Sequence, residues 1–323
     1  MTNDLFERII EAHRAIRPQV AVTPLSFSPM LSEMTGCQVY LKGEHLQHTG
    51  SFKFRGATNK IRLLDTQTRG NGVLTVSSGN HGQGVALAGK LAGVPVTVYA
   101  SSSASAIKLD AIRAWGAEVV TIDDTTLAVE LEAARQSRLR GMAFISPYND
   151  IDVIAGQGTV GVEICEQGRA DGVELAAVFA SVGGGGLICG VGTAMKQLSP
   201  DTNIVACWPK NSTALYNSLQ AGEIVESPEF DTISDGTAGG IEPGSITFDI
   251  AQRIIDRSEL VSEEEIKAAM KLLAQTDRWM VEGAAGVALA SMLKLAPMYQ
   301  GRALAVVLCG RNIMLDKFIE AVK

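Results

Sequence analysis

Lys53 is the residue of this chain that is best suited to covalent chemistry. It stands between Phe52 and Phe54 in the run 51–57. A lysine taken alone is most often a solvated surface group. Two flanking aromatic rings would instead remove water from the ammonium group and favour the neutral amine, which is the form that attacks carbonyl carbons. The pattern therefore indicates a lysine that forms a Schiff base.

Four successive glycines lie between a strand-like and a helix-like segment. Without side chains, their backbone N–H groups can approach a phosphate closely, and a helix N-terminus adds a favourable dipole. A flexible tight turn is the competing interpretation. The run does not match a dinucleotide fingerprint, because Cys189 stands where that motif needs glycine, and no Gly-Lys-Ser/Thr follows as in a P-loop. We expect a phosphate cradle formed by Gly183, Gly184, Gly185 and Gly186.

A second polar turn, residues 77–82, follows the strand-like segment 73–76. Taken alone it is explained by helix capping, for which serine and asparagine are preferred. As part of a site, Asn80 can donate and accept hydrogen bonds in one plane. The hydroxyls of Ser77 and Ser78 would be available for proton transfer. The turn lies at a predicted helix start, which is a geometry that binds anions.

A nucleophilic lysine, a polar turn and a glycine cradle together indicate an enzyme that uses pyridoxal 5′-phosphate (PLP). The lysine would carry the cofactor as a Schiff base, and the glycines would hold its phosphate. Two nearby residues are ambiguous. His81 alone is more often structural than catalytic, and Cys309, at the end of a strand-like segment, is more often a small buried hydrophobe.

These motifs must be positioned by segments that alternate between strand-like and helix-like patterns. Such alternation predicts βαβ units and mostly parallel sheets, with ligands beyond the carboxyl ends of the strands. Both glycine-rich turns fall at such ends. The predicted strands are 39–42, 73–76, 96–100, 119–122, 142–145, 176–182, 204–207 and 303–309, and the predicted helices are 52–64, 83–91, 106–115, 126–138, 160–167 and 187–198.

Three further segments complete this organisation. Ser262 and Glu265 form a capping box that begins a helix running to about Gln275. The apolar segment 303–309 is predicted to be a central strand buried on both faces. The irregular stretch 222–244, rich in Gly, Pro, Ser and Asp, is expected to form a loop that borders the site.

Composition restricts the class of protein. At 323 residues and 46% hydrophobic content, the chain is long enough for two lobes. A net charge of −7 argues against nucleic acid or an anionic membrane as a partner. The longest apolar runs are too short to cross a bilayer, and the N-terminus lacks signal-peptide features. Five scattered cysteines without a C-x-x-C pair fit reduced thiols, so a cytoplasmic protein is expected.

The three motifs, in this order, resemble the tryptophan-synthase-β-like (fold type II) PLP-dependent enzymes. Within them the chain is most similar to the serine/threonine dehydratases and serine racemase. The resemblance covers nearly the whole chain and includes the segments 23–25, 41–44 and 154–159, with Lys108 before the Gly-Ala-Glu-Val of 116–119. It implies an α/β fold of two lobes with parallel-rich twisted sheets flanked by helices. The implied domains are a large PLP-binding domain, residues 1–70 plus 150–323, and a small substrate-closing domain, residues 71–149.

The resemblance also implies roles for single residues. Lys53 would form the internal aldimine and act as base at Cα, Phe52 would pack beside the cofactor ring, and Asn80 would hydrogen-bond its 3′-oxygen. Ser78 matches the serine that faces the opposite side of Cα in the racemase. Asp150 matches an acidic residue near the distal end of the substrate. The implied substrate-binding set is Ser77, Ser78, Gly79, Asn80, His81, Asp150 and Gly236.

The chain departs from the family pattern at two places. Cys309 replaces the serine beside the pyridine nitrogen, and Arg311 follows in place of a small residue. A thiol is the poorer hydrogen-bond partner, so the nitrogen is expected to stay unprotonated, and a close Arg311 would reinforce this. Trp208 stands where racemase-like members have a metal-binding glutamate. We therefore predict no metal.

The resulting hypothesis is a PLP-dependent carbon–nitrogen lyase that converts a β-hydroxy-α-amino acid to a 2-oxo acid and ammonia. Threonine or serine is the default substrate, and phenylserine and hydroxyaspartate are the bulkier and acidic alternatives. A racemase on the same scaffold is the second hypothesis, and a non-catalytic PLP or amino-acid binding protein is a remote third. The family also suggests a homodimer. These alternatives stay open at the level of sequence.

Overall fold

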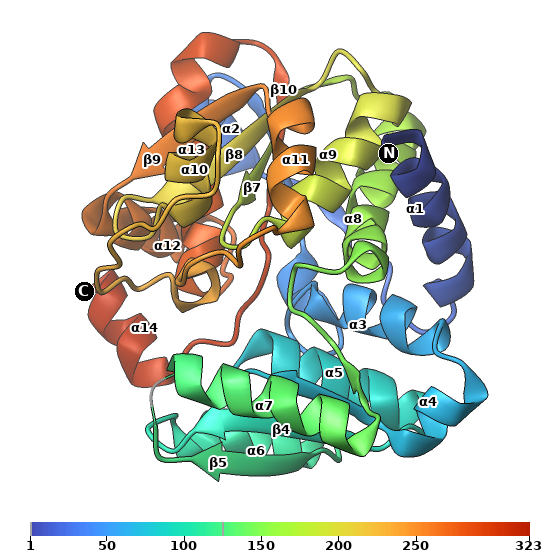
Figure 1. The fold of residues 1–323 in the computed structure, drawn as a ribbon. Coiled ribbons are helices and arrows are strands. Elements are labelled where there is room, and N and C mark those ends of the chain that lie inside the picture. Colours follow the sequence, from blue (N-terminus) through green and yellow to red (C-terminus); the bar gives the residue numbers. More distant parts are fainter. Residues whose placement is uncertain (1, 125) are drawn as a thin grey trace.

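Two β-sheets form the centre of the computed structural model, which describes residues 2–124 and 126–323 (Figure 1). The larger sheet has six strands in the order β1-β2-β10-β7-β8-β9, and the smaller has four in the order β5-β4-β3-β6. The strands of the larger sheet are β1 (Leu25–Phe27), β2 (Gln38–Lys42), β7 (Leu175–Ser181), β8 (Asn203–Pro209), β9 (Arg257–Val261) and β10 (Ala303–Val307). Those of the smaller sheet are β3 (Val73–Val76), β4 (Val96–Ser101), β5 (Glu118–Ile122) and β6 (Ala143–Phe144).

Helices cover both sheets. In the first half of the chain they are α1 (Thr2–Ile16), α2 (Pro29–Thr35), α3 (Lys53–Arg62), α4 (Thr66–Asn71), α5 (Asn80–Ala92), α6 (Ala106–Ala114), α7 (Thr126–Arg140) and α8 (Ile151–Ala170). In the second half they are α9 (Gly186–Leu198), α10 (Ala214–Ala221), α11 (Ile246–Ile254), α12 (Glu263–Thr276), α13 (Gly283–Leu295) and α14 (Leu315–Val322). Short 3₁₀ turns are η1 (Glu44–Leu46), η2 (Asp235–Thr237) and η3 (Ala296–Tyr299).

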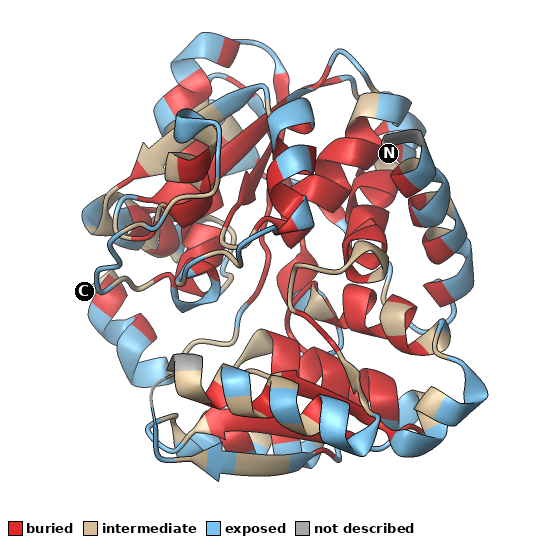
Figure 2. Cartoon of the chain, in the orientation of Figure 1, coloured by how far each residue is buried: buried red, intermediate tan, exposed pale blue. Residues whose placement is uncertain are grey.

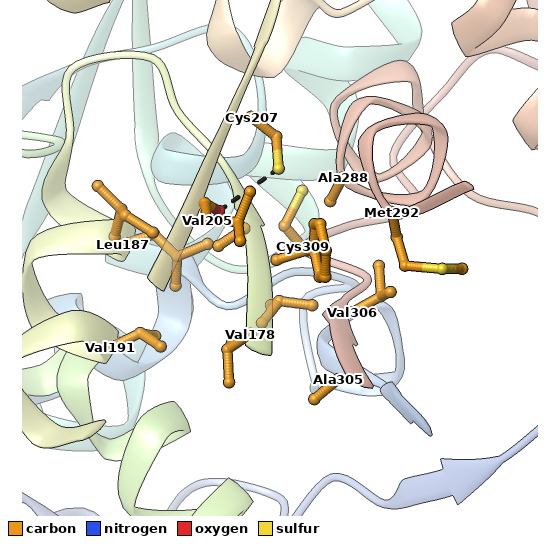
Figure 3. Packing of buried hydrophobic residues seen from close by; sticks show 14 of the residues in the cluster. Val178, Leu187, Val191, Val205, Cys207, Ala288, Met292, Ala305, Val306 and Cys309 are labelled. Carbon is orange, nitrogen blue, oxygen red and sulfur yellow. Dashed lines mark hydrogen bonds between the residues drawn. The ribbon is translucent and has the colours of Figure 1, made fainter. Parts of the chain in front are cut away.

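The strand pairing is parallel except between β1 and β2, which confirms the predicted parallel-rich α/β fold. Strand β10 lies between β2 and β7, and all five of its residues are buried, as predicted for a central strand. Helices α9 and α13 pack on opposite faces of this region. Figure 3 shows Val178, Val205 and Ala305 of the sheet between Leu187 of α9 and Met292 of α13.

Burial follows the layers. Figure 2 shows buried residues concentrated in the strands and in α8 and α9, whereas the outer faces of α1, α7 and α14 are exposed. Helix α8 begins at Ile151, nine residues earlier than the predicted helix 160–167. The first part of this helix was not predicted because glycine is a poor helix former. In the structure these glycines allow close packing against neighbouring helices. A β-carbon on Gly156 would lie 2.6 Å from the Cα atom of Gly56, so these two helices approach backbone to backbone.

Helix α3 joins the two halves of the molecule. Phe52, directly before it, packs in the large core cluster with the six-stranded sheet. Phe54, Ala57 and Ile61 pack instead in a second cluster, with residues of the small sheet and α5. The strands of the small sheet all fall within residues 71–149, but part of their core comes from α3. The domain boundaries given above remain a prediction.

Four buried charged side chains, one of them from α3, pair with one another. We call them the Arg55 network: Lys42, Glu44, Arg55 and Glu163. Arg55 pairs with Glu44 (Nε–Oε2 2.8 Å) and with Glu163 (Nη1–Oε1 2.8 Å). Lys42 pairs with the other oxygen of Glu163 (Nζ–Oε2 2.7 Å). All four side chains are at most 1% exposed. Two cations and two anions therefore balance inside the protein.

In the described ranges, no helix has the length and apolar character needed to cross a bilayer. The same ranges contain no cluster of three or more His, Cys, Asp or Glu side chains arranged to hold a metal ion. Trp208, at the position where racemase-like members have a metal ligand, is buried in β8. Its ring packs at 5.3 Å from the ring of Tyr216.

Candidate active site

A cavity of about 310 Å³ opens where the carboxyl ends of β3, β7 and β10 meet. This volume is at the lower end of the range for small-molecule sites, ~300–1,000 Å³. The polar turn after β3, the glycine run after β7 and the end of β10 all reach it. The sequence-predicted residues that line it are Phe52, Lys53, Ser77, Ser78, Gly79, Asn80, His81, Gly183, Gly184, Gly185, Gly186, Gly236 and Cys309.

Lys53 is the first residue of α3 and lies half-buried at the cavity wall. Its Nζ atom donates a hydrogen bond to the carbonyl oxygen of Pro147 at 2.8 Å and lies 5.2 Å from the centre of the Phe52 ring. Burial lowers the pKa of Lys53 to about 8, although the negative charge of Glu282 opposes the shift. Near that pH about half of the amine is neutral and therefore nucleophilic.

Only one of the two flanking aromatic rings contributes at the cavity. Phe52 lines it, whereas Phe54 is fully buried in the second core cluster and contacts the ring of His48 (centroids 5.7 Å apart). Successive residues at a helix start point in different directions, which explains the difference. The predicted desolvation of Lys53 is present, but the whole cavity wall produces it and not a pair of phenylalanines.

The polar turn begins α5 and presents its helix N-terminus to the cavity. Gly79 is the N-cap residue, and its N–H group donates to the hydroxyl of Ser77 at 3.1 Å. His81 is buried and its Nε2 atom lies 2.9 Å from the carbonyl oxygen of Ile145. A carbonyl only accepts, so Nε2 carries the proton. Burial, and the nearby charge of Lys53, lower the pKa of His81 to about 3, so the ring is neutral.

The glycine run forms the N-terminus of α9, with Gly185 as the N-cap at φ +92°. The first N–H groups of a helix have no intrahelical partners, and here they are at the cavity wall. A β-carbon on Gly184 would overlap the ring of Tyr148, and one on Gly183 would lie 3.0 Å from Cα of Thr237. Glycine is therefore required for close approach. The unpaired N–H groups and helix dipole fit a phosphate, and Lys53 fits an aldehyde.

Comparison with known proteins identifies the family. A family model described as "Pyridoxal-phosphate dependent enzyme" matches residues 16–310. The chain belongs to this family. The recognition of a fold type II, tryptophan-synthase-β-like PLP-dependent enzyme is thereby confirmed, and PLP is its cofactor.

Individual members resemble the chain along most of its length. An L-threonine ammonia-lyase from Thermotoga maritima is 39% identical over 318 residues, which cover 97% of this chain and 78% of that protein. A beta-hydroxyaspartate dehydratase from Paracoccus denitrificans is 35% identical over 312 residues, which cover 97% of each chain. The structure of the processed form of threonine deaminase isoform 2 from Solanum lycopersicum matches with a TM-score of 0.94 at 33% identity. It covers 99% of this chain and 88% of the tomato chain.

In this PLP-dependent enzyme the thiol of Cys309 lies at the end of β10 and accepts a hydrogen bond from the hydroxyl of Ser181 (Oγ–Sγ 3.5 Å). Burial raises the pKa of Cys309, so the thiol stays protonated. Arg311 is exposed and does not line the cavity. Burial lowers the pKa of His45 to about 4, and the positive charge of Arg311 contributes to the same shift. The suggested influence of Arg311 on the cofactor ring or on the substrate finds no support.

Asp150 is the one predicted site residue that the structure places elsewhere. Its Oδ1 atom caps α8, accepting hydrogen bonds from the N–H groups of Asp152 (2.8 Å) and Val153 (3.1 Å). Its Oδ2 atom pairs with Lys60 at 2.7 Å. Both oxygens are occupied, and the residue does not line the cavity. Asp150 is therefore the N-cap of α8, and its contact with the distal end of the substrate stays a prediction.

Several cavity residues were missed by sequence analysis. Tyr148 packs over the glycine run, and Lys108 pairs with Asp235 across the rim at 2.9 Å. Glu282 and Asn312 form hydrogen bonds with Asn80. For Glu282 a signal was available. It is the only charged residue between Met280 and Leu293, and an isolated charge in an apolar segment often marks a functional position.

Proposed function

We propose that this enzyme is an ammonia-lyase that dehydrates a β-hydroxy-α-amino acid and yields a 2-oxo acid and ammonia. The observation that carries the proposal is the placement of Lys53, with a pKa of about 8, between the glycine run and the polar turn at one cavity. The relatives named for threonine ammonia-lyase and beta-hydroxyaspartate dehydratase activity support it.

Each residue at the cavity has a role that follows from its position. When bound, PLP supplies the electron withdrawal that makes the Cα proton of an attached amino acid acidic. Lys53, in its neutral form, is the base that removes this proton. The N-terminus of α5 at Ser78 and Gly79 attracts the substrate carboxylate, and the N-terminus of α9 holds the cofactor phosphate. Asn80, which lines the same cavity, would hydrogen-bond the 3′-oxygen of the cofactor.

A small, uncharged side chain on the substrate is the best match for this cavity. Among the described residues that line it, Lys53 and Lys108 are the lysines, and no arginine is present. The charge of Lys108 is already balanced by Asp235 at 2.9 Å. Tyr148 further reduces the space beside the glycine run. We therefore propose L-threonine or L-serine as substrate, with hydroxyaspartate as the competitor that would have to displace Asp235 from Lys108.

A racemase is the second candidate because Ser78 lines the cavity, where it could protonate the second face of Cα. Both reactions begin with removal of the same proton, so product analysis separates them. Ammonia and 2-oxo acid indicate elimination. Appearance of the D-amino acid, detected by chiral chromatography, would indicate racemisation.

We also propose that the protein is a cytoplasmic homodimer. Large exposed apolar side chains gather on edge strand β1 and helix α2 and beside them, namely Val22, Phe27, Met30 and Met34. Such a patch is typical of an interaction surface. Sedimentation equilibrium would give about twice the 34.1 kDa chain mass if the proposal holds, and the mass of one chain would contradict it.

The decisive experiment measures ammonia and 2-oxo acid release by the PLP-loaded protein. The panel is L-serine, L-threonine, threo-phenylserine and threo-hydroxyaspartate, with Lys53→Ala as control. Turnover of L-threonine or L-serine that is lost in the variant would support the proposal. Turnover of hydroxyaspartate alone would correct the substrate. No release from any of the four, with PLP bound, would overturn the ammonia-lyase assignment.

A further inference from the structure

Glu282 occupies a helix N-cap position without capping the helix. It precedes α13, where Ser, Thr, Asp or Asn is usual, and its side chain makes no hydrogen bond to the helix N–H groups. The carboxylate points instead into the wall of the cavity and is buried. A β-carbon on Gly310 would lie 2.6 Å from Glu282 Oε1, and one on Gly236 3.1 Å from the same atom. The glycines on both sides thus leave room for this carboxylate.

The carboxylate is held by Asn80 and Asn312. The Nδ2 atom of Asn80 lies 2.8 Å from Oε1 and 3.0 Å from Oε2 of Glu282. The backbone N–H of Asn312 donates to Oε2 at 3.1 Å. Because the two oxygens of a carboxylate lie close together, a single N–H of Asn80 can serve both. The amide has a second N–H group, and Asn80 lines the cavity.

A second amide fixes the opposite side of Asn80. Asn312 Nδ2 donates to Asn80 Oδ1 at 2.6 Å and to the carbonyl oxygen of Thr49 at 2.8 Å. A backbone carbonyl only accepts, so it determines which end of the Asn312 amide carries the N–H groups. Asn312 then requires the oxygen of Asn80 to face it. A carboxylate also only accepts, so Glu282 requires the nitrogen of Asn80 on the other side. Both neighbours select the same orientation of this amide.

The carboxylate of Glu282 interacts electrostatically with several groups around the cavity. Burial raises the pKa of Glu282, while its hydrogen bonds with Asn80 and Asn312 and the charge of Lys108 oppose the increase and Asp235 adds to it. The carboxylate also attracts the ammonium group of Lys53. The residue is therefore a buried acceptor at the cavity wall, in contact with the Asn80 amide.

We propose that Glu282 and Asn312 are positioning residues that lock the Asn80 amide, so that its second N–H is aimed at the 3′-oxygen of bound PLP. The inference rests on the role given to Asn80 in the proposed function. Neither residue needs to touch the reacting atoms. Their contribution is to preset the donor, so that cofactor binding does not have to reorient an amide or leave its oxygen facing the cofactor oxygen.

Two variants and one matched control test the proposal. Glu282→Gln replaces an acceptor-only group by an amide, and Asn312→Ala removes the donor to Asn80. Glu242→Gln is the control, because Glu242 also accepts a hydrogen bond from an asparagine amide (Asn149 Nδ2–Oε2 2.8 Å) but does not line the cavity. The readouts are the dissociation constant for PLP, measured by titration of cofactor-free protein, and the pH midpoint of the visible spectrum of the bound cofactor. Thermal unfolding of the cofactor-free proteins reports folding.

We expect both cavity variants to bind PLP about tenfold more weakly or worse, since each disturbs a hydrogen bond to a charged or buried group. The pH midpoint of the spectrum should shift in both and stay unchanged in Glu242→Gln. Wild-type affinity and midpoint in a folded Asn312→Ala would overturn the inference, even if Glu282→Gln does not fold. Wild-type protein that binds no PLP would overturn the proposed function together with it.

Discussion

Two polar networks, one centred on Arg55 and one on Glu282, are completed in different ways. In the Arg55 network every charge has an opposite charge within 2.8 Å, and the four side chains are closed off from solvent. In the Glu282 network, the set Asn80, Glu282 and Asn312, the carboxylate is held by amides. Within the described part of the chain it forms no ion pair.

This difference indicates that the Arg55 network stabilises the fold, whereas the Glu282 network serves the site. A buried ion pair stabilises only if both partners are present, and removal of one leaves a costly unpaired charge. The Arg55 network satisfies itself and needs no ligand. In the Glu282 network, by the proposal above, the second N–H of Asn80 is left for a ligand, and Lys53 lines the same cavity. Perturbed groups that face a cleft in this way are candidates for chemistry.

The largest expected effect comes from Lys53→Ala. Loss of the base and of the covalent attachment point should lower turnover by a factor of ~10²–10⁴ or more. The melting temperature of the cofactor-free protein should not fall, because the half-buried Lys53 forms no ion pair within the described residues and its Nζ donates to a backbone carbonyl. Ammonia release and calorimetry measure the two quantities. A large loss of stability would show that Lys53, like Arg55, is structural.

The opposite pattern is expected for Arg55→Met. It leaves Glu44 and Glu163 buried with Lys42 as the remaining cation, so the free energy of unfolding should fall by about 3–5 kcal/mol. Arg62→Met is the matched control, because Arg62 pairs with the exposed Glu11 and such pairs contribute about 1 kcal/mol or less. Urea unfolding measures both. Equal losses in the two variants would contradict the distinction between the networks.

A pH dependence should distinguish the cavity amine from ordinary lysines. Burial lowers the pKa of Lys53 to about 8, so the neutral amine increases as the pH rises through that value. The rate of PLP capture by cofactor-free protein should therefore increase between pH 7 and 9, with a midpoint near 8. Stopped-flow absorbance follows the reaction. A rate that still increases steeply above pH 10 would indicate an unshifted lysine.

The smallest effect is expected for Cys309→Ser, which introduces the residue that the resemblance described above implies at this position. The thiol is buried, protonated and weakly bonded to Ser181, so a hydroxyl of similar shape can replace it. The change in the free energy of unfolding should stay within about 1.5 kcal/mol. Turnover should change by less than about tenfold on the same basis. A thousandfold change in activity would show that the thiol takes part in the reaction.

Sequence analysis succeeded where a motif is contiguous. Strand β3 was predicted at its observed bounds, because an apolar run ends at the polar turn that follows it. The lysine, polar turn and glycine run each bring their own backbone geometry, so they could be placed before the fold was known. The same argument located the loop with Gly236 beside the cavity.

Sequence analysis failed where a role depends on distant partners. Glu282 meets Asn80 across 202 residues, and Asn312 meets Asn80 across 232. No local pattern encodes such a contact. Helix α13 was missed because it is buried on nearly all sides and shows no amphipathic period. The capping role of Asp150 was also missed, because a capping carboxylate and a substrate-binding carboxylate look the same in sequence.

The division of α3 between two core clusters has a consequence for the order of folding. Phe54, Ala57 and Ile61 tie the helix of Lys53 to the small sheet, whereas the glycine run belongs to the large one. Phe52, at the start of the same helix, packs in the large cluster, so the position of Lys53 depends on both clusters. We therefore expect the site to be complete only after both sheets have formed and docked. During refolding from urea, recovery of helix signal should precede capture of PLP. The absorbance of bound PLP would then report the rate of the last step of folding.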